Sequence, residues 1–266
     1  MILTHEHIYR DIAKEDTFVA RSDKNKLLGV CTVSLRNMST LFPDCPLQYV
    51  IQIDADDVSK AALFGAAVAH VRMLHYQTNA PARAYAEVEV GDKESLRVLE
   101  ALGFQTTDGV VRMHRMVTGE DNYHLLPPGC TIVRDFLNDP MERRFFLERY
   151  NACYDLNNDE KWLNEIISQS DFARILMVST EDLCGELLVW TENGKGVIGM
   201  IQTARRWQRM GVASYLMDDA RLYFKSIGIH DAQMDVWKSA PGAMQLAYAA
   251  GYSGETPILL YPEMDL

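Results

Sequence analysis

The stretch Gln208-Arg209-Met210-Gly211-Val212-Ala213 lies between a strand-like run, residues 196–202, and an amphipathic helical run that begins at Ser214. A tight loop that enters a helix directs several backbone N–H groups toward one point, at the positive end of the helix dipole, and this arrangement suits a pyrophosphate. Gly211 has no Cβ, so the backbone there allows a phosphate to come close. The stretch therefore predicts a phosphate-binding loop, although six residues alone also fit an ordinary strand-to-helix turn.

The residues after this loop follow the order helix, strand, helix. Apolar residues recur at helical spacing over 216–224, and Gly228 ends the run. Residues 231–238 then alternate as a strand does, and Pro241 opens a short helical segment before Gly251-Tyr252. This is the order that a fold for a nucleotide-type cofactor requires.

The combination of Thr203, Gln208, Gly211 and Ala213, followed by a helix that ends in Gly251-Tyr252, resembles the GNAT superfamily of acyl-CoA-dependent N-acetyltransferases. The loop of that family reads Gln/Arg-x-x-Gly-x-Gly/Ala, and the resemblance covers residues 131–266 clearly. It implies an α/β (α+β) fold, with a mixed, mostly antiparallel twisted sheet flanked by helices.

An internal repeat extends the resemblance to the first half. An offset of 148 places, without a gap, sets residues 83–88 on 231–236 and residues 102–104 on 250–252. The same offset places Lys60, Leu63 and Gly65 opposite Gln208, Gly211 and Ala213. A leucine in the place of the loop glycine, preceded by Asp54, Asp56 and Asp57, would repel a phosphate. We therefore expect a degenerate first half, and the alternative is a different α/β domain with one similar hairpin.

The turn-forming residues around 118–129 indicate a domain boundary. We expect a shortened GNAT-like domain at 1–118, a linker at 119–130 and an acetyl-CoA-binding GNAT domain at 131–266. Only a short helical region is expected between Arg10 and Thr17, so the first half lacks the helices that usually cover an acceptor pocket. In the second half we expect strands at 131–134, 174–179 and 185–190 and helices at 140–154 and 159–168.

Composition excludes several classes of function. The chain has 266 residues and a net charge of −11, which argues against a nucleic-acid partner. Five cysteines without CxxC spacing predict reduced thiols and a cytoplasmic protein. The sequence predicts neither a signal peptide nor a membrane span. His5 and His7 have no third ligand nearby, so no metal is expected, and HExxH, GxSxG and GxGxxG motifs are absent.

The resemblance implies direct transfer of an acetyl group from acetyl-CoA, as cosubstrate, to an amine acceptor. The coenzyme-binding residues that it implies are Ile201, Gln202, Thr203, Gln208, Arg209, Met210, Gly211, Val212, Ala213 and Ser214. Backbone N–H groups of residues 201–203 are expected to hold the pantetheine and polarise the thioester carbonyl.

The resemblance also implies an acid for the departing thiolate and a base for the amine. Many family members carry a tyrosine in the last helix for the first role. Here Ala247 stands at the aligned position and Tyr248 follows it, so Tyr248 is the candidate acid. Glu186 is the candidate base that we select, with Glu192 and Asp235 as other carboxylates on nearby strands.

Two functions remain open at this stage. The first is an N-acetyltransferase for a small-molecule or peptidyl amine, and the acidic chain favours a cationic acceptor such as a polyamine or an aminoglycoside. The second is a non-catalytic acyl-CoA-binding or sensor protein. The identity of the acceptor, the acyl chain and the oligomeric state, including a homodimer, are left open.

Overall fold

The computed structural model describes residues 1–266 except 10–11, 79, 118–125, 181 and 241. Residues 119–125 of the expected linker therefore lie outside the described residues. The strands are β1 (Ile2–His5), β2 (Thr17–Arg21), β3 (Leu27–Asn37), β4 (Leu47–Ala55), β5 (Ala82–Ala86), β6 (Val88–Glu89), β7 (Gln105–Met116), β8 (Cys130–Asp135), β9 (Ser170–Ser179), β10 (Leu183–Glu192), β11 (Lys195–Thr203), β12 (Asp231–Trp237) and β13 (Ser253–Asp265). The helices are α1 (Asp57–Tyr76), α2 (Lys93–Ala101), α3 (Pro140–Tyr154), α4 (Glu160–Ile167), α5 (Val212–Ser226) and α6 (Ala243–Ala249), with short 3₁₀ turns η1 (Lys14–Asp16) and η2 (Arg205–Trp207).

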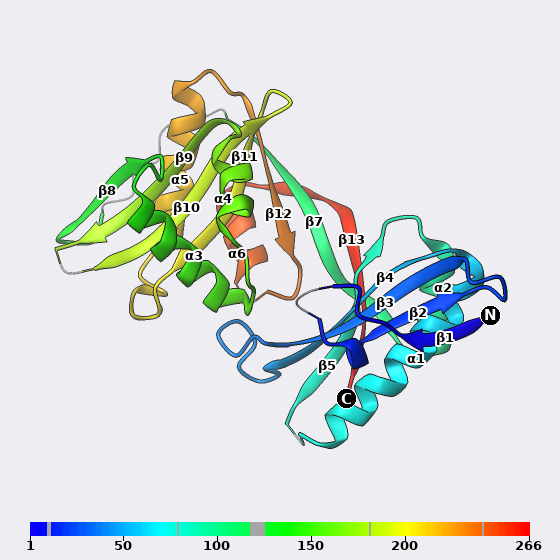
Figure 1. The fold of residues 1–266 in the computed structure, drawn as a ribbon. Helices are drawn as coiled ribbons and strands as arrows, with labels where there is room; N and C mark the ends of the chain where they lie inside the picture. The colour runs from blue at the N-terminus through cyan, green and yellow to red at the C-terminus, as the bar shows by residue number, and fades with distance from the viewer. Residues whose placement is uncertain (10–11, 79, 118–125, 181, 241) are drawn as a thin grey trace.

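All the strands join into one mixed, mostly antiparallel sheet. Its order is β1-β2-β3-β4-β5-β13-β7-β12-β11-β10-β9-β8, and β6 pairs with β13. The last strand, β13, therefore lies between β5 and β7 of the first half, and β7 in turn lies between β13 and β12 of the second half. Figure 1 shows these two long strands running side by side from one lobe to the other. Each half thus receives a strand from the other.

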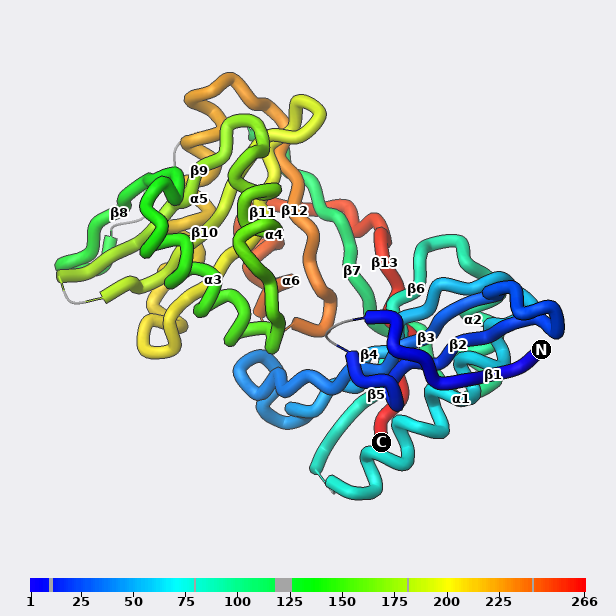
Figure 2. Tube along the Cα trace, in the orientation of Figure 1, coloured from blue at the N-terminus to red at the C-terminus, as the bar shows by residue number. Residues whose placement is uncertain are grey.

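Helices cover the two faces of the second half. Leu187 and Val189 of β10 belong to the core under α5 and α6, whereas Leu188, which lies between them in sequence, packs with residues of α3 and α4. Successive side chains of a strand point to opposite faces, so these two helix pairs lie on opposite sides of the sheet. The first half has one such core, under α1 and α2. The path of the chain through both lobes can be followed in Figure 2.

Local sequence signals account for the elements of the second half. Asp139 caps α3 by accepting a hydrogen bond from the backbone N–H of Met141, and Pro140 occupies the first turn, as expected. Asn193 and Gly194 have φ angles of 51° and 75° in the tight turn between β10 and β11. The short helix before Gly251 is α6. Pro241, which we expected to open it, lies outside the described residues.

The first half lacks a phosphate loop for a different reason from the one the repeat suggested. Strand β4 ends at Ala55 and α1 begins at Asp57, so no loop separates them. Leu63 is not in a loop at all, because it lies inside α1 and is fully buried in the core. The gapless alignment was therefore wrong at this point. In the first half, residues 60–65, which align with the 208–213 loop, belong to α1.

The helices in the described part of the chain are too short or too polar to span a lipid bilayer.

Gly109, on β7 at its contact with β13, gives a test of the exchanged strands. A Cβ at this position would lie 2.4 Å from the carbonyl oxygen of Leu259. We predict that Gly109→Ala lowers the free energy of unfolding by about 2 kcal/mol, because the two strands must move apart. Gly65→Ala, in α1 with nothing within 4 Å of the new methyl group, is the control and should be neutral or stabilise by about 1 kcal/mol. Urea denaturation followed by circular dichroism measures both, and equal effects would contradict the strand contact.

Candidate functional site

The site begins where two parallel strands stop pairing. Strands β11 and β12 pair only between Gly196–Ile198 and Ala232–Met234, although they continue to Thr203 and Trp237. Within the described residues, the part of β11 after Ile198 and the part of β12 after Met234 therefore form no backbone pairs with each other. Ile201, Gln202 and Thr203, expected to contact the coenzyme, lie on this unpaired part of β11.

A bulge marks the point of separation. The pairing of β10 with β11 shifts between Leu188 and Val189, whose partners are Met200 and Ile198, so Gly199 has no partner. A Cβ on Gly199 would lie 1.8 Å from the ring of Trp190. Only glycine therefore fits here, because the tryptophan packs directly over the backbone.

The loop from β11 to α5 contains one side-chain hydrogen bond back to β11 and two residues with positive φ. After η2, Gln208 is extended, and its side-chain amide donates to the carbonyl of Thr203 at 3.4 Å. Arg209 and Gly211 have φ angles of 64° and 81°. A side chain at Gly211 would be strained by this backbone conformation alone.

The start of α5, like that of α6 at Gly242, differs from the starts of α1 to α4. Aspartate side chains cap α1 to α4 and accept hydrogen bonds from their first-turn N–H groups. The N-cap of α5 is Gly211, and no side chain caps the helix. The first N–H groups of α5 are therefore left for another acceptor. Val212 anchors this turn, since it is 1% exposed and packs in the core.

Three arginines come shortly before this helix start in the sequence. Arg205, Arg206 and Arg209 are exposed, and Arg206 forms an ion pair with Asp182. The uncapped N–H groups and the guanidinium groups give the loop the chemistry of an anion site.

The equivalent point in the first half is closed to an anion. Asp56 accepts from the backbone N–H of Ser59 at 3.2 Å, so a carboxylate already occupies the start of α1. Asp57 follows it and pairs with Lys60, whose ammonium also contacts Asp92 at 2.8 Å. Negative charge fixed at the helix start would repel a phosphate.

Glu186 lies on β10 in a buried ion-pair cluster. Its side chain is 1% exposed and accepts hydrogen bonds from Arg149 at 2.8 and 3.0 Å and from Arg174 at 2.9 Å. Arg174 also contacts Glu142 of α3 at 3.1 Å. Both carboxylate oxygens of Glu186 are thus occupied, and the cluster holds α3 against the sheet. The geometry favours a structural role over that of a base.

Tyr248 points away from the core. It is 50% exposed, and its hydroxyl donates to the carboxylate of Glu255 on β13. This hydrogen bond raises the pKa of Tyr248. Ala247, one position earlier, is fully buried in the core under α5 and α6. The one-residue offset thus turns the phenol of Tyr248 away from the buried face that Ala247 occupies.

Of the two other candidate bases, one is held in an ion pair and one lies at the exposed end of a strand. Asp235 accepts from Arg112 of β7 at 2.7 and 2.8 Å, and Glu192 is exposed at the hairpin end of β10. Among the described residues, no group of three metal-binding side chains is arranged to hold a metal ion.

Asp108 is a buried residue that the sequence did not single out. Its side chain accepts from the indole N–H of Trp237 at 2.7 Å, from the backbone N–H and hydroxyl of Ser239, and from the N–H of Gly109. It therefore fixes the end of β12 to β7. Its partners are distant in sequence, so no local pattern could have revealed it.

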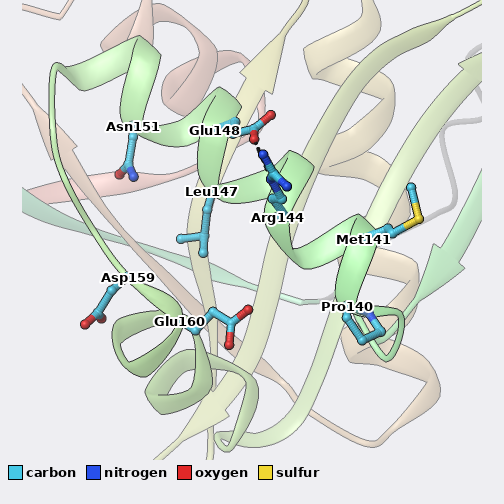
Figure 3. A pocket seen from close by; sticks show the side chains of 8 residues that line it. All are labelled: Pro140, Met141, Arg144, Leu147, Glu148, Asn151, Asp159 and Glu160. Atoms are coloured by element: carbon cyan, nitrogen blue, oxygen red, sulfur yellow. Dashed lines mark hydrogen bonds and ion pairs between the residues drawn. The ribbon is translucent and has the colours of Figure 1, made fainter.

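Two pockets lie elsewhere on the molecule. The first, of about 570 Å³, lies along α3 and the start of α4, and Figure 3 shows Met141 and Leu147 of α3 together with Asp159 and Glu160. The second, of about 450 Å³, is lined by residues of the first half and by the end of β13. Among the described residues, neither lining includes a member of the 201–214 segment.

Comparison with known proteins shows the fold. No family model matches the chain, and no curated protein matches its sequence. A GCN5-related N-acetyltransferase from Sphaerobacter thermophilus matches with 16% identity and a TM-score of 0.53, over 96% of this chain and 82% of that one. A tandem GNAT protein from the clavulanic acid biosynthesis pathway matches with 13% identity and a TM-score of 0.50, over 94% and 82%. An Enterococcus faecalis protein described as a probable N-acyltransferase matches with 12% identity and a TM-score of 0.56, over 92% and 61%.

The chain therefore has the GNAT fold, and one of its neighbours is a tandem member. This confirms the fold class expected from the 208–213 loop and the internal repeat.

The Glu186 cluster yields a prediction about stability. Glu186→Gln removes the charge that compensates Arg174, which is 1% exposed, so the free energy of unfolding should fall by about 3 kcal/mol. Glu148→Gln, which breaks the exposed pair with Arg144, is the control and should change it by less than about 0.5 kcal/mol. Thermal and urea unfolding measure both. A Glu186→Gln variant that is fully stable would show that the carboxylate is not structural.

Proposed function

We propose that the chain is an acetyl-CoA-dependent N-acetyltransferase that transfers an acetyl group to an amine by direct attack. The observation that carries the proposal is the uncapped start of α5, with Gly211 at a φ of 81°, beside the separated ends of β11 and β12. An anion site that follows a strand end without backbone pairing to its parallel neighbour is what a long, phosphate-bearing thioester requires.

In this proposal the second half, 131–266, binds the coenzyme and the first half, 1–118, does not. The backbone N–H groups of residues 211–214 bind the pyrophosphate, and Arg205 and Arg209 add positive charge beside it. The unpaired backbone of Ile201 to Thr203 lies alongside the pantetheine and polarises the thioester carbonyl. The acyl donor is a cosubstrate, so no metal is required.

Proton transfer in this proposal relies on water. The amine must lose a proton, and the thiolate must gain one. Tyr248 donates its hydroxyl to Glu255, and both oxygens of Glu186 are engaged by arginines. Water is then the simplest carrier for both protons.

The same observations support the second candidate, an acyl-CoA-binding or sensor protein without turnover. Amine-dependent release of CoA decides between the two. A panel of small amines, aminoglycosides and peptides with free amino termini is incubated with acetyl-CoA, and free thiol is followed. CoA release with any amine supports the enzyme, and saturable acetyl-CoA binding without release across the panel supports the sensor.

Gly211 provides the test of the coenzyme loop. Acetyl-CoA should raise the melting temperature of the wild type, because a ligand that binds only the native state stabilises it. Gly211→Val should abolish that increase. Gly228→Val is the matched control, since Gly228 lies at the other end of α5 with a φ of 78° and open space around it. This control should lower the melting temperature and keep the increase with acetyl-CoA. An unchanged increase in Gly211→Val would refute the loop assignment.

We also predict one acetyl-CoA site per chain. The start of α1 already holds the carboxylate of Asp56, whereas the start of α5 is uncapped. Isothermal titration calorimetry should therefore give a stoichiometry of about one. A value near two would show that the first half also binds the coenzyme.

The variant Tyr248→Phe tests whether water or the phenol of Tyr248 gives the proton to the departing thiolate. Since the hydroxyl faces Glu255, removal of the oxygen should leave kcat within about twofold of the wild type. A loss of the roughly 100-fold that general acid catalysis commonly supplies would restore Tyr248 to the acid role.

A further inference from the structure

Two free thiols meet in the core under α5 and α6. The Sγ atoms of Cys130 and Cys184 lie 3.9 Å apart, although the two residues are 54 positions apart in the sequence. Cys130 is the first residue of β8, Cys184 is the second residue of β10, and both pack in the same core. A disulfide requires the two sulfurs to be about 2 Å apart, so this pair needs only a small approach to form one.

Cys184 lies at a bulge in β10. The pairing of β10 with β9 shifts between Leu183 and Gly185, so Cys184 has no partner there. Strand β9 lies between β8 and β10, and strands two places apart in a regular sheet are about 10 Å from each other. A bulge re-aims a side chain, and here it helps to bring the thiol of Cys184 to that of Cys130.

Cys184 is the fixed member of the pair. It is fully buried, and its carbonyl accepts a hydrogen bond from the backbone N–H of Ala204 at 3.0 Å. The next residue, Gly185, packs so closely that a Cβ there would lie 2.8 Å from the side chain of Val212. The backbone at Cys184 is thus held by the segment that leads into α5.

Cys130 is the member that can approach. It is half-buried and begins β8, the strand at the edge of the second half (Figure 1). Gly129 before it has a φ of 77°, and an added Cβ there would have nothing within 4 Å. Packing at this strand end is therefore loose, and the approach of about 2 Å falls to Cys130.

The two thiols differ in their access to an oxidant. Cys130 is half-buried, so a small peroxide can reach its sulfur. Burial raises the pKa of the Cys184 thiol, and the hydrogen bond with Cys130 raises it further. A buried thiol with a raised pKa reacts slowly with an oxidant in solution. Cys130 is thus the thiol that meets the oxidant first, and Cys184 is placed to react with the product.

We propose that Cys130 and Cys184 form a reversible disulfide when the chain meets hydrogen peroxide. The Cys130 sulfur attacks one oxygen and the O–O bond breaks, which gives a sulfenic acid, while the departing hydroxide takes the thiol proton and leaves as water. The Cys184 sulfur then attacks the sulfenic sulfur. The S–S bond forms, the S–O bond breaks, and the hydroxide leaves with the Cys184 proton as a second water. A small thiol such as glutathione reduces the bond by exchange and is itself oxidised.

The disulfide joins the edge strand β8 to the strand that packs against the start of α5. It closes the segment from Cys130 to Cys184, which restricts the unfolded chain and stabilises the folded one. Oxidation therefore stabilises the second half, and a thiol reductant reverses the effect. This inference is independent of the transferase function.

The test is titration of the full chain with hydrogen peroxide, with the thiols counted after denaturation. One equivalent should consume two of the five thiols of the wild type, and dithiothreitol should restore both. Peptide mapping without reductant should find Cys130 linked to Cys184 within one chain, and the melting temperature should rise by several degrees. Cys45→Ser replaces the other half-buried cysteine, so it is the matched control and should behave as the wild type does. Cys130→Ser should form no internal disulfide.

Dimedone, which labels sulfenic acids, tests the order of the two steps. Cys184→Ala should be labelled at Cys130 several-fold more than the wild type, because the second thiol is absent. The proposal is overturned if the oxidised wild type contains another pair, only links between chains, or no link at all, or if Cys130→Ser still loses two thiols. Circular dichroism verifies that each variant is folded, and the map of the wild type decides without any variant.

Discussion

The backbone pairing of β13 with β7 is the constraint on which the rest of the structure depends. Because β13 also pairs with β5, and β7 with β12, these two strands join the halves into one sheet. Gly109 allows the close approach, and Asp108 beside it binds the indole of Trp237 and both polar groups of Ser239. The end of β12 is thus positioned by residues of the first half. The sheet of each half therefore includes a strand from the other half.

A second constraint acts at the helix starts. Asp56 closes the start of α1 with its own carboxylate, whereas Gly211 leaves the first turn of α5 open. A glycine at this position costs only a few tenths of a kcal/mol relative to a capping side chain, and α6 likewise begins at Gly242 without a side-chain cap. The difference between Asp56 and Gly211 is the reason that we propose one coenzyme site and not two.

Much of the second half could be predicted from local sequence. Asp139-Pro140, Asn193-Gly194 and Gly211 each determine a cap, a turn or a loop through the backbone conformation of the residues themselves. The exchange of β7 and β13 could not be predicted, because strand partners far apart in sequence leave no local pattern. The gapless repeat misplaced Leu63 because α1 begins seven residues before the position aligned with the start of α5. The partners of Glu186 and Tyr248 could likewise not be predicted, because Arg174, Arg149 and Glu255 come from other elements of the fold.

The central claim is that the start of α5 and the opening between β11 and β12 together hold the acyl donor. A crystal structure of the full chain with acetyl-CoA tests it most directly. The account predicts the pyrophosphate within hydrogen-bonding distance of the backbone N–H groups of residues 211–214, and the pantetheine between β11 and β12. Coenzyme bound at the start of α1, or in the groove along α3, would contradict it.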